Sequence, residues 1–182
     1  MAKNANLIEK SRIYLVGFMG AGKSTIGPLL ARQLNWSFCD LDVEIEKQQG
    51  CPIREIFTTR GEATFREMET SALRQWAGEP SLVIALGGGA FIGEANRQIV
   101  QQSGLSIFLD CPLELVLERC RRDSARPLFS DPQSILQLVQ SRRPFYLQSD
   151  LQIDVRGLSP EEIVLEILAM LNRKDSRQRN GS

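Results

Sequence analysis

Three glycines, a lysine and a serine stand at fixed spacing near the start of the chain. Residues 17–24, GFMGAGKS, match the pattern G-x-x-x-x-G-K-[ST] and follow an apolar run at residues 13–16. Glycines permit backbone angles that let successive N–H groups converge on an anion, and a helix that begins near Lys23 adds the positive end of its dipole. We therefore predict a phosphate site, with Lys23 on the β and γ phosphates and Ser24 as a ligand of Mg²⁺. The alternative is a plain glycine turn between a strand and a helix.

Two carboxylates follow the next apolar run, in the segment FCDLD. In an extended stretch, residues i and i+2 lie on the same face, so Asp40 and Asp42 are expected to face the phosphate site together. One would hold a metal-bound water, and the other would accept a hydrogen bond from a substrate hydroxyl. The alternative is a helix N-cap, a position that favours aspartate. For Asp42, a capping role does not exclude a role in the site.

The segment GEATFREMET, residues 61–70, begins with a turn glycine and continues into a helix. Glu62, Arg66 and Glu69 fall on neighbouring helical turns, which is typical of a solvated, salt-bridged face. A functional role is also open, because arginine is suited to a bidentate grip on a carboxylate. In that case Glu69 would aim the guanidinium of Arg66.

Three glycines, residues 87–89, directly follow another apolar run. A flexible loop is one interpretation. A compact domain does not need a glycine run at a strand end for flexibility alone, so close approach of the backbone to a ligand is favoured.

The segment of residues 118–133 is charged, contains prolines and lacks a regular pattern. Its arginines are Arg119, Arg121, Arg122 and Arg126. They could be solvated or could bind RNA, but beside a phosphate loop they favour a lid that brings arginine onto the transferring phosphoryl group. Further along, Arg142 and Arg143 precede Pro144, and we expect one of the two to face the cleft.

Strand-like runs alternate with helical patterns along the chain. The expected strands are residues 13–16, 37–39, 82–86, 106–109 and 151–155. The expected helices are residues 23–34, 43–49, 53–59, 62–76, 93–102, 113–122, 134–149 and 160–172. This alternation predicts an α/β fold with a parallel sheet covered by helices on both faces. Ligands bind beyond the carboxyl ends of such strands, where these motifs lie.

The composition argues against several classes of function. Lysine plus arginine and aspartate plus glutamate number 22 each, so no net charge favours nucleic acid or an anionic membrane. No apolar run approaches the roughly 20 residues of a membrane span, and the first residues lack the apolar core of a signal peptide. The four cysteines show no C-x-x-C spacing and are expected to be reduced thiols in the cytoplasm. The chain contains no histidine, so acid–base chemistry must fall to carboxylates, lysine or water.

Taken together and in this order, six motifs resemble those of the shikimate kinase family over roughly residues 10–170. They are GFMGAGKST, FCDLD, GEATFREMET, LGGGA, RPLF and RRPFY. The resemblance implies a three-layer P-loop kinase fold, similar to that of nucleoside monophosphate kinases, with a five-stranded parallel sheet and a lid. It also implies Mg²⁺-dependent transfer of the γ-phosphoryl group of ATP to the 3-hydroxyl of shikimate, on the pathway to aromatic amino acids.

The resemblance assigns roles to individual residues. The catalytic residues would be Lys23, Asp42 and the lid residue Arg126. The ATP-binding residues would be Gly20, Ala21, Gly22, Lys23, Ser24, Thr25, Arg119 and Arg126. The substrate-binding residues would be Asp42, Arg66, Gly87, Gly88, Gly89 and Arg142. Mg²⁺ would be held by Ser24 directly and by Asp40 through water.

We expect a single kinase domain over residues 1–172. Within it, the lid would occupy about residues 121–133 and the substrate-binding region about residues 40–70, and residues 173–182 would form a disordered tail. The enzyme is expected to act as a cytoplasmic monomer on ATP and shikimate, without nucleic acid or membrane. A kinase similar to gluconate kinase and a catalytically inactive nucleotide-binding module are the alternatives.

Overall fold

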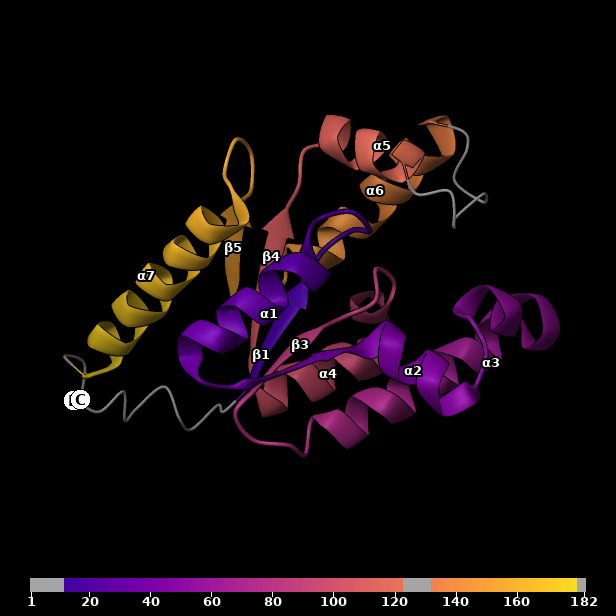
Figure 1. Ribbon diagram of the computed structural model, residues 1–182, viewed down its shortest axis with the longest axis horizontal. Helices are drawn as coiled ribbons and strands as arrows, with labels where there is room; N and C mark the ends of the chain where they lie inside the picture. The colour runs from indigo at the N-terminus through magenta and orange to yellow at the C-terminus, as the bar shows by residue number, and fades with distance from the viewer. Residues whose placement is uncertain (1–11, 123–131, 180–182) are drawn as a thin grey trace.

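The computed structural model describes residues 12–122 and 132–179 (Figure 1). The strands are β1 (Arg12–Val16), β2 (Ser37–Asp40), β3 (Leu82–Ala85), β4 (Leu105–Asp110) and β5 (Leu151–Asp154). The helices are α1 (Lys23–Leu34), α2 (Leu41–Gln49), α3 (Ile53–Trp76), α4 (Glu94–Ser103), α5 (Leu113–Arg122), α6 (Pro132–Tyr146) and α7 (Pro160–Arg179), with a short 3-10 turn, η2 (Ala90–Ile92). None of the helices in these ranges is long and apolar enough to cross a membrane.

The five strands form one parallel sheet in the order β2-β3-β1-β4-β5. The central strand β1 pairs with β3 on one side and with β4 on the other. The predicted parallel α/β fold is thereby confirmed. Because all strands run in the same direction, the phosphate loop, the FCDLD segment and the glycine run all lie at one edge of the sheet.

Alternate side chains of β1 enter two separate cores. Tyr14 and Val16 are buried on one face of the sheet with residues of α2, α3 and α6, whereas Ile13 and Leu15 are buried on the other face with residues of α1 and α7. This alternation follows from the two-residue period of a strand. Two layers of helices therefore enclose the sheet, and they hold its carboxyl edge in place (Figure 1).

Two helices differ from the sequence-based expectation. Helix α3 joins the two helices predicted at residues 53–59 and 62–76, with a break at Gly61, whose φ of 81° and ψ of 167° are not helical. Helix α7 runs to Arg179, so residues 173–179 are helical where we expected a disordered tail. Extending an existing helix through arginine, lysine and glutamine needs no new nucleus, which gives a physical reason for the difference. Residues 180–182 lie outside the described part.

The predicted lid falls largely outside the described residues. Helix α5 ends at Arg122 and helix α6 begins at Pro132, so residues 123–131, which include Arg126, are not described. The two helices that flank this segment both lie near the carboxyl end of β4 (Figure 1).

Candidate active site

The phosphate loop connects β1 to α1. Gly17, Gly20 and Gly22 have φ angles of 147°, 75° and 96°, a region that residues with a side chain rarely adopt. Gly22 is the N-cap of α1, and the backbone N–H of Ile26 donates to its carbonyl at 2.8 Å. The loop therefore directs the N-terminus of α1 toward the carboxyl edge of the sheet, as binding of an anion at a helix N-terminus requires.

Lys23 is folded back over this loop. Its Nζ donates to the carbonyl oxygens of Gly17 and Phe18, at 2.7 and 2.9 Å, and the side chain is almost fully buried. The ammonium group is thus held at the centre of the loop, where it can neutralise a bound phosphate.

Ser24 and Asp40 meet beside the loop. The Ser24 hydroxyl donates to Asp40 Oδ2 at 2.5 Å, and the other carboxylate oxygen of Asp40 accepts from the backbone N–H of Asp42 at 3.2 Å. A hydroxyl and a carboxylate side by side fit Mg²⁺, which takes hard oxygen ligands and usually binds one or two carboxylates together with water and substrate phosphates.

The FCDLD segment differs in detail from the prediction. Asp40 ends β2 and caps α2, whereas Asp42 lies in the first turn of α2, so the two carboxylates do not share one strand face. The helix begins two residues earlier than predicted because the Asp40 carboxylate caps it by accepting from the backbone N–H of Asp42 in the first turn. Both residues nevertheless line the same cleft, because the strand ends and the helix begins at its rim.

This cleft has a volume of about 440 Å³ and runs along the phosphate loop. The predicted site residues that line it are Gly20, Ala21, Gly22, Lys23, Ser24, Thr25, Asp40, Asp42, Gly88 and Arg119. Its lining also includes the apolar residues Val155, Leu158 and Ile163. Arg119 donates through Nη1 to the carbonyl of Gly20 at 2.6 Å, so α5 is linked to the phosphate loop.

The remaining predicted substrate residues meet at the glycine loop, residues 87–89, beside the cleft. A Cβ added at Gly87 would overlap the carboxylate of Asp42, and one at Gly89 would lie 2.5 Å from both terminal nitrogens of Arg66. A Cβ at Gly88 would lie 3.3 Å from the backbone nitrogen of Met19 in the phosphate loop. At Gly87 and Gly89 the neighbouring side chains thus approach the bare backbone too closely for a Cβ, whereas at Gly88 a Cβ would make only a tight contact.

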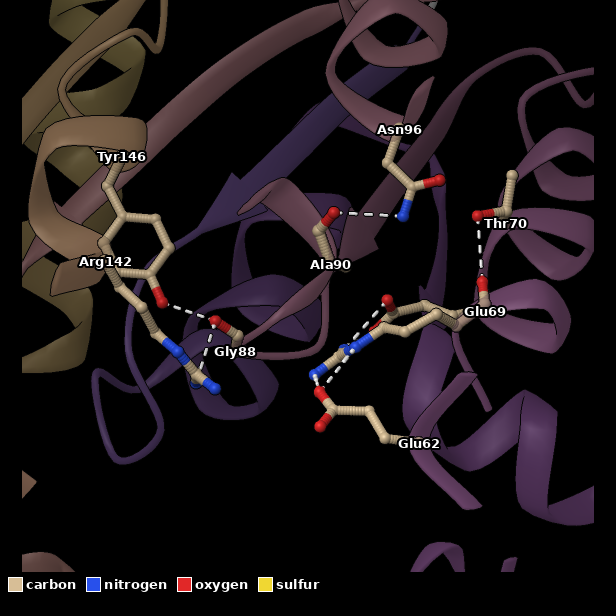
Figure 2. A network of polar contacts seen from close by, with 9 residues as sticks. Glu62, Glu69, Thr70, Gly88, Ala90, Asn96, Arg142 and Tyr146 are labelled. Atoms are coloured by element: carbon tan, nitrogen blue, oxygen red, sulfur yellow. Dashed lines mark hydrogen bonds and ion pairs between the residues drawn. The ribbon is translucent and has the colours of Figure 1, made fainter. Parts of the chain in front are cut away.

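Arg66 forms ion pairs with two carboxylates of its own helix, those of Glu62 and Glu69, which are labelled in Figure 2. It donates from Nη2 to Glu62 at 3.0 Å and from Nη1 to both oxygens of Glu69 at 3.0 and 3.2 Å. Glu62 is exposed, but the Glu69 side chain is only 1% exposed, so this is not a purely solvated face. Burial tends to lower the pKa of Arg66, but the two carboxylates outweigh it and the pKa is raised. The guanidinium remains charged and directed at the glycine loop.

Glu69 has a strongly perturbed acidity. Burial, together with the nearby charge of Asp42, raises its pKa to about 7 against the opposing attraction of Arg66. A buried carboxylate needs a paired charge to stay ionised, and Arg66 supplies that charge. Glu69 therefore holds Arg66 in place and is sensitive to pH.

Arg142, and not Arg143, faces the glycine loop. Its Nη1 lies 3.4 Å from the carbonyl oxygen of Gly88, and its guanidinium lies 5.7 Å from the ring of Phe18. Arg143 instead forms an ion pair with Asp110 at the end of β4. The structure thus places Arg142 at the glycine loop and Arg143 at Asp110, a choice that the sequence left open.

Two contacts, one to the glycine loop and one to the 3-10 turn η2 that follows it, were not predicted (Figure 2). The Tyr146 hydroxyl donates to the carbonyl of Gly88, and Asn96 donates to the carbonyl of Ala90 at 3.0 Å. Tyr146 is the last residue of RRPFY, one helical turn after Arg142, and this i,i+4 spacing was the available signal. No motif pointed to Asn96.

Comparisons with known proteins agree with this geometry. A family model described as shikimate kinase matches residues 19–172. The shikimate kinase of Persephonella marina is 44% identical over 160 residues, which cover 87% of this chain and 98% of that protein. The shikimate kinase of Aquifex aeolicus is 42% identical over 162 residues, which cover 88% of this chain and 95% of that protein.

Solved structures of shikimate kinases are also similar to this chain. A shikimate kinase from Acinetobacter baumannii, solved in complex with shikimate, superposes with a TM-score of 0.86 at 37% identity and covers 90% of this chain and 94% of that one. A gluconokinase from Sinorhizobium meliloti has a TM-score of 0.64 at 20% identity and covers 95% of this chain and 98% of that one, which shows a common fold alone. With a family model across most of its length and relatives above 40% identity, the chain belongs to the shikimate kinase family.

Proposed function

We propose that the chain transfers the γ-phosphoryl group of ATP to the 3-hydroxyl of shikimate, which gives shikimate 3-phosphate and ADP. The observation that carries the proposal is the position of the glycine loop, which contacts the phosphate loop on one side and two arginines on the other. A donor of phosphate and a small carboxylic acid would thus be held next to each other. A relative 37% identical to this chain was solved with shikimate bound, which supports the choice of acceptor.

The donor side is assigned to the phosphate loop and its neighbours. Residues 20–25 would bind the phosphates of ATP, with Lys23 placed by Gly17 and Phe18 to neutralise the charge that develops on the transferred group. The apolar residues near Pro160, together with Arg119, which also lines the cleft, would receive the adenine. Arg126, outside the described residues, is assigned to the phosphates as the lid arginine by resemblance.

Mg²⁺ is proposed as the cofactor, held by Ser24 directly and by Asp40 through water. These two groups already hydrogen-bond to each other beside the phosphate loop. When bound, the ion supplies positive charge to the phosphate oxygens. These two residues would hold that charge beside the phosphate loop, which also carries Lys23.

The acceptor side is assigned to the glycine loop and its three neighbours. Arg66 and Arg142 would bind the carboxylate of shikimate, because guanidinium groups make charge-assisted hydrogen bonds to carboxylates. Asp42 would accept hydrogen bonds from the ring hydroxyls, including the one that attacks. The backbone of residues 87–89 would approach the substrate closely. Phosphoryl transfer then depends on positioning and charge neutralisation, which a site without histidine can supply.

The proposal includes activity as a monomer. ATP and shikimate would be the only partners that the site requires. The proposal places the enzyme in the cytoplasm, where ATP is available and the thiols of Cys39, Cys51 and Cys111 stay reduced.

A coupled ADP-release assay with a panel of acceptors tests the proposal. Shikimate should support turnover, whereas gluconate and AMP should give rates near that of ATP alone. Gluconate is the sharpest competitor because it also carries a carboxylate and hydroxyls. Turnover with gluconate but not shikimate would favour the alternative kinase, and no turnover with any acceptor would favour an inactive nucleotide-binding module.

A further inference from the structure

Helix α6 ends at the glycine loop with a buried tyrosine that the proposed chemistry does not use. We propose that Tyr146 is a positioning residue for shikimate: its hydroxyl holds the carbonyl of Gly88 and leaves Arg142 available for the substrate carboxylate. This inference rests on the proposed function and adds a residue to its acceptor site.

The position of the Tyr146 hydroxyl is fixed by packing. The side chain is 2% exposed, and its ring lies 5.3 Å from that of Phe108 with an interplanar angle of 34°. Its hydroxyl donates to the carbonyl oxygen of Gly88 (Figure 2). Burial raises the pKa of Tyr146 to about 12, so the hydroxyl keeps its proton and remains a donor at neutral pH.

Tyr146 and Arg142 share one acceptor, the carbonyl of Gly88. They lie one turn apart on α6, and both point toward the glycine loop (Figure 2). The Arg142 Nη1 atom is 3.4 Å from the oxygen, which is long for an N–H···O bond. The tyrosine hydroxyl therefore makes the closer of the two contacts, and the arginine contact is the easier one to give up.

Substrate binding would make the tyrosine contact more important. When Arg142 turns to the carboxylate of shikimate, it gives up its long contact with Gly88, and the carbonyl then depends on Tyr146. The carbonyl of Gly88 is partly buried, and the loss of a partner for such a carbonyl is costly. Removal of the Tyr146 hydroxyl should therefore destabilise the shikimate complex more than the free protein. The difference between the two free energies is measured as a loss of affinity for shikimate.

The same hydroxyl also orients the next peptide group. In a planar trans peptide, the carbonyl of Gly88 and the N–H of Gly89 point in opposite directions, and the described backbone contains no cis peptide bond. A carbonyl held toward α6 thus turns the N–H of Gly89 away from α6. Gly89 is also the residue that approaches Arg66 so closely that a Cβ would overlap the guanidinium. The surroundings of both Arg66 and Arg142 therefore depend on the orientation of the peptide between Gly88 and Gly89.

The variant Tyr146→Phe removes the hydroxyl and keeps the ring. The chain contains one other tyrosine, Tyr14, which is fully buried and whose hydroxyl hydrogen-bonds the Ser103 hydroxyl at 2.6 Å, away from the residues that line the cleft. Tyr14→Phe is therefore a matched control that loses a buried hydroxyl elsewhere. The dissociation constants for shikimate and for an ATP analogue would be measured by calorimetry, together with the Tm of each variant.

In Tyr146→Phe we expect the shikimate Kd of the nucleotide-free protein to rise about tenfold, equivalent to roughly 1.4 kcal/mol. The Kd of the ATP analogue should stay within twofold. In Tyr14→Phe both constants should stay within twofold, while the Tm of the two variants should fall by similar amounts. A shikimate Kd in Tyr146→Phe less than threefold above that of Tyr14→Phe would overturn the inference, whatever the change in Tm. If the unmodified protein does not bind shikimate at all, the proposed function fails, and the inference fails with it.

Discussion

Substitution of Gly89 by alanine should damage shikimate recognition while the fold stays intact. An added Cβ would lie 2.5 Å from both terminal nitrogens of Arg66 and 2.8 Å from its Cζ atom. Non-bonded atoms need a separation of about 3.5 Å, so the guanidinium would have to retreat by roughly 1 Å. Its retreat is opposed by Glu69, which is buried and bonded to the same guanidinium at 3.0 and 3.2 Å.

The size of the effect follows from this displacement. The group that must move is the end of a long side chain, so we expect little change in Tm. A misplacement of about 1 Å in a binding group can cost on the order of 100-fold in rate. We therefore expect Gly89→Ala to lower kcat/KM for shikimate by roughly 30- to 100-fold, with the KM for ATP within twofold.

Gly93→Ala provides the matched control. Gly93 has an ordinary φ of −68°, and a Cβ there would lie 3.8 Å from the Ala90 carbonyl oxygen, in normal contact. Steady-state kinetics with shikimate varied at saturating ATP would compare the two variants. A kcat/KM for Gly89→Ala within threefold of that for Gly93→Ala would refute the steric link between the glycine loop and Arg66.

Three other changes test separate parts of the site. Lys23→Ala should lower kcat by at least about 100-fold, because a group that stabilises the charge of the transferred phosphoryl in the transition state is worth about 3–4 kcal/mol. Turnover within threefold of the unmodified enzyme would contradict the assignment of the phosphate loop. Ser24→Ala should raise the Mg²⁺ concentration needed for half-maximal activity and leave the KM for shikimate unchanged, and an unaltered Mg²⁺ titration would argue against Ser24 as a ligand. The pKa of Glu69 is raised from 4.5 to about 7 in the folded state, so the folded state keeps a proton that the unfolded state releases between these pH values. The stability that protonated Glu69 contributes is therefore fully present below pH 4.5. About 3 kcal/mol of the free energy of unfolding is lost as the pH rises to 7. Urea unfolding of the unmodified protein and of Glu69→Gln at several pH values should show this loss only in the former, and parallel profiles would contradict the titration of Glu69.

The fold was largely predictable because its signals are local. Strands β1, β3 and β4 contain short apolar runs, the helices have their own period, and the motifs stand at the strand ends where a parallel sheet binds ligands. The break at Gly61 was likewise visible as a glycine between two helical patterns. The extension of α7 to Arg179 was not visible, because a charged segment has no apolar period of its own.

The acceptor site was predictable only in part, because its contacts join distant segments. The Glu62–Arg66–Glu69 arrangement follows from helical spacing and was expected. By contrast, Tyr146 lies 58 residues from Gly88, and only packing of α6 against the glycine loop brings them together.

The sequence also did not predict which of Arg142 and Arg143 faces the glycine loop. The two side chains are neighbours in sequence, but one reaches Gly88 and the other pairs with Asp110. The direction of each is set by the rotation of α6 about its axis, which a local motif does not encode.

A two-by-two kinetic comparison tests most directly whether Arg66 binds the carboxylate of shikimate. It combines the unmodified enzyme and Arg66→Leu with shikimate and with methyl shikimate, which lacks the carboxylate charge. Loss of one partner from a buried charge pair costs roughly 2–5 kcal/mol, so Arg66→Leu should lower kcat/KM for shikimate by about 30-fold or more. The ester should be a poor substrate of the unmodified enzyme and should lose little further with Arg66→Leu, because the same contact is already absent. Fully additive losses from the ester and the substitution would contradict a direct contact and would leave Arg66 as a structural member of a salt-bridged helix.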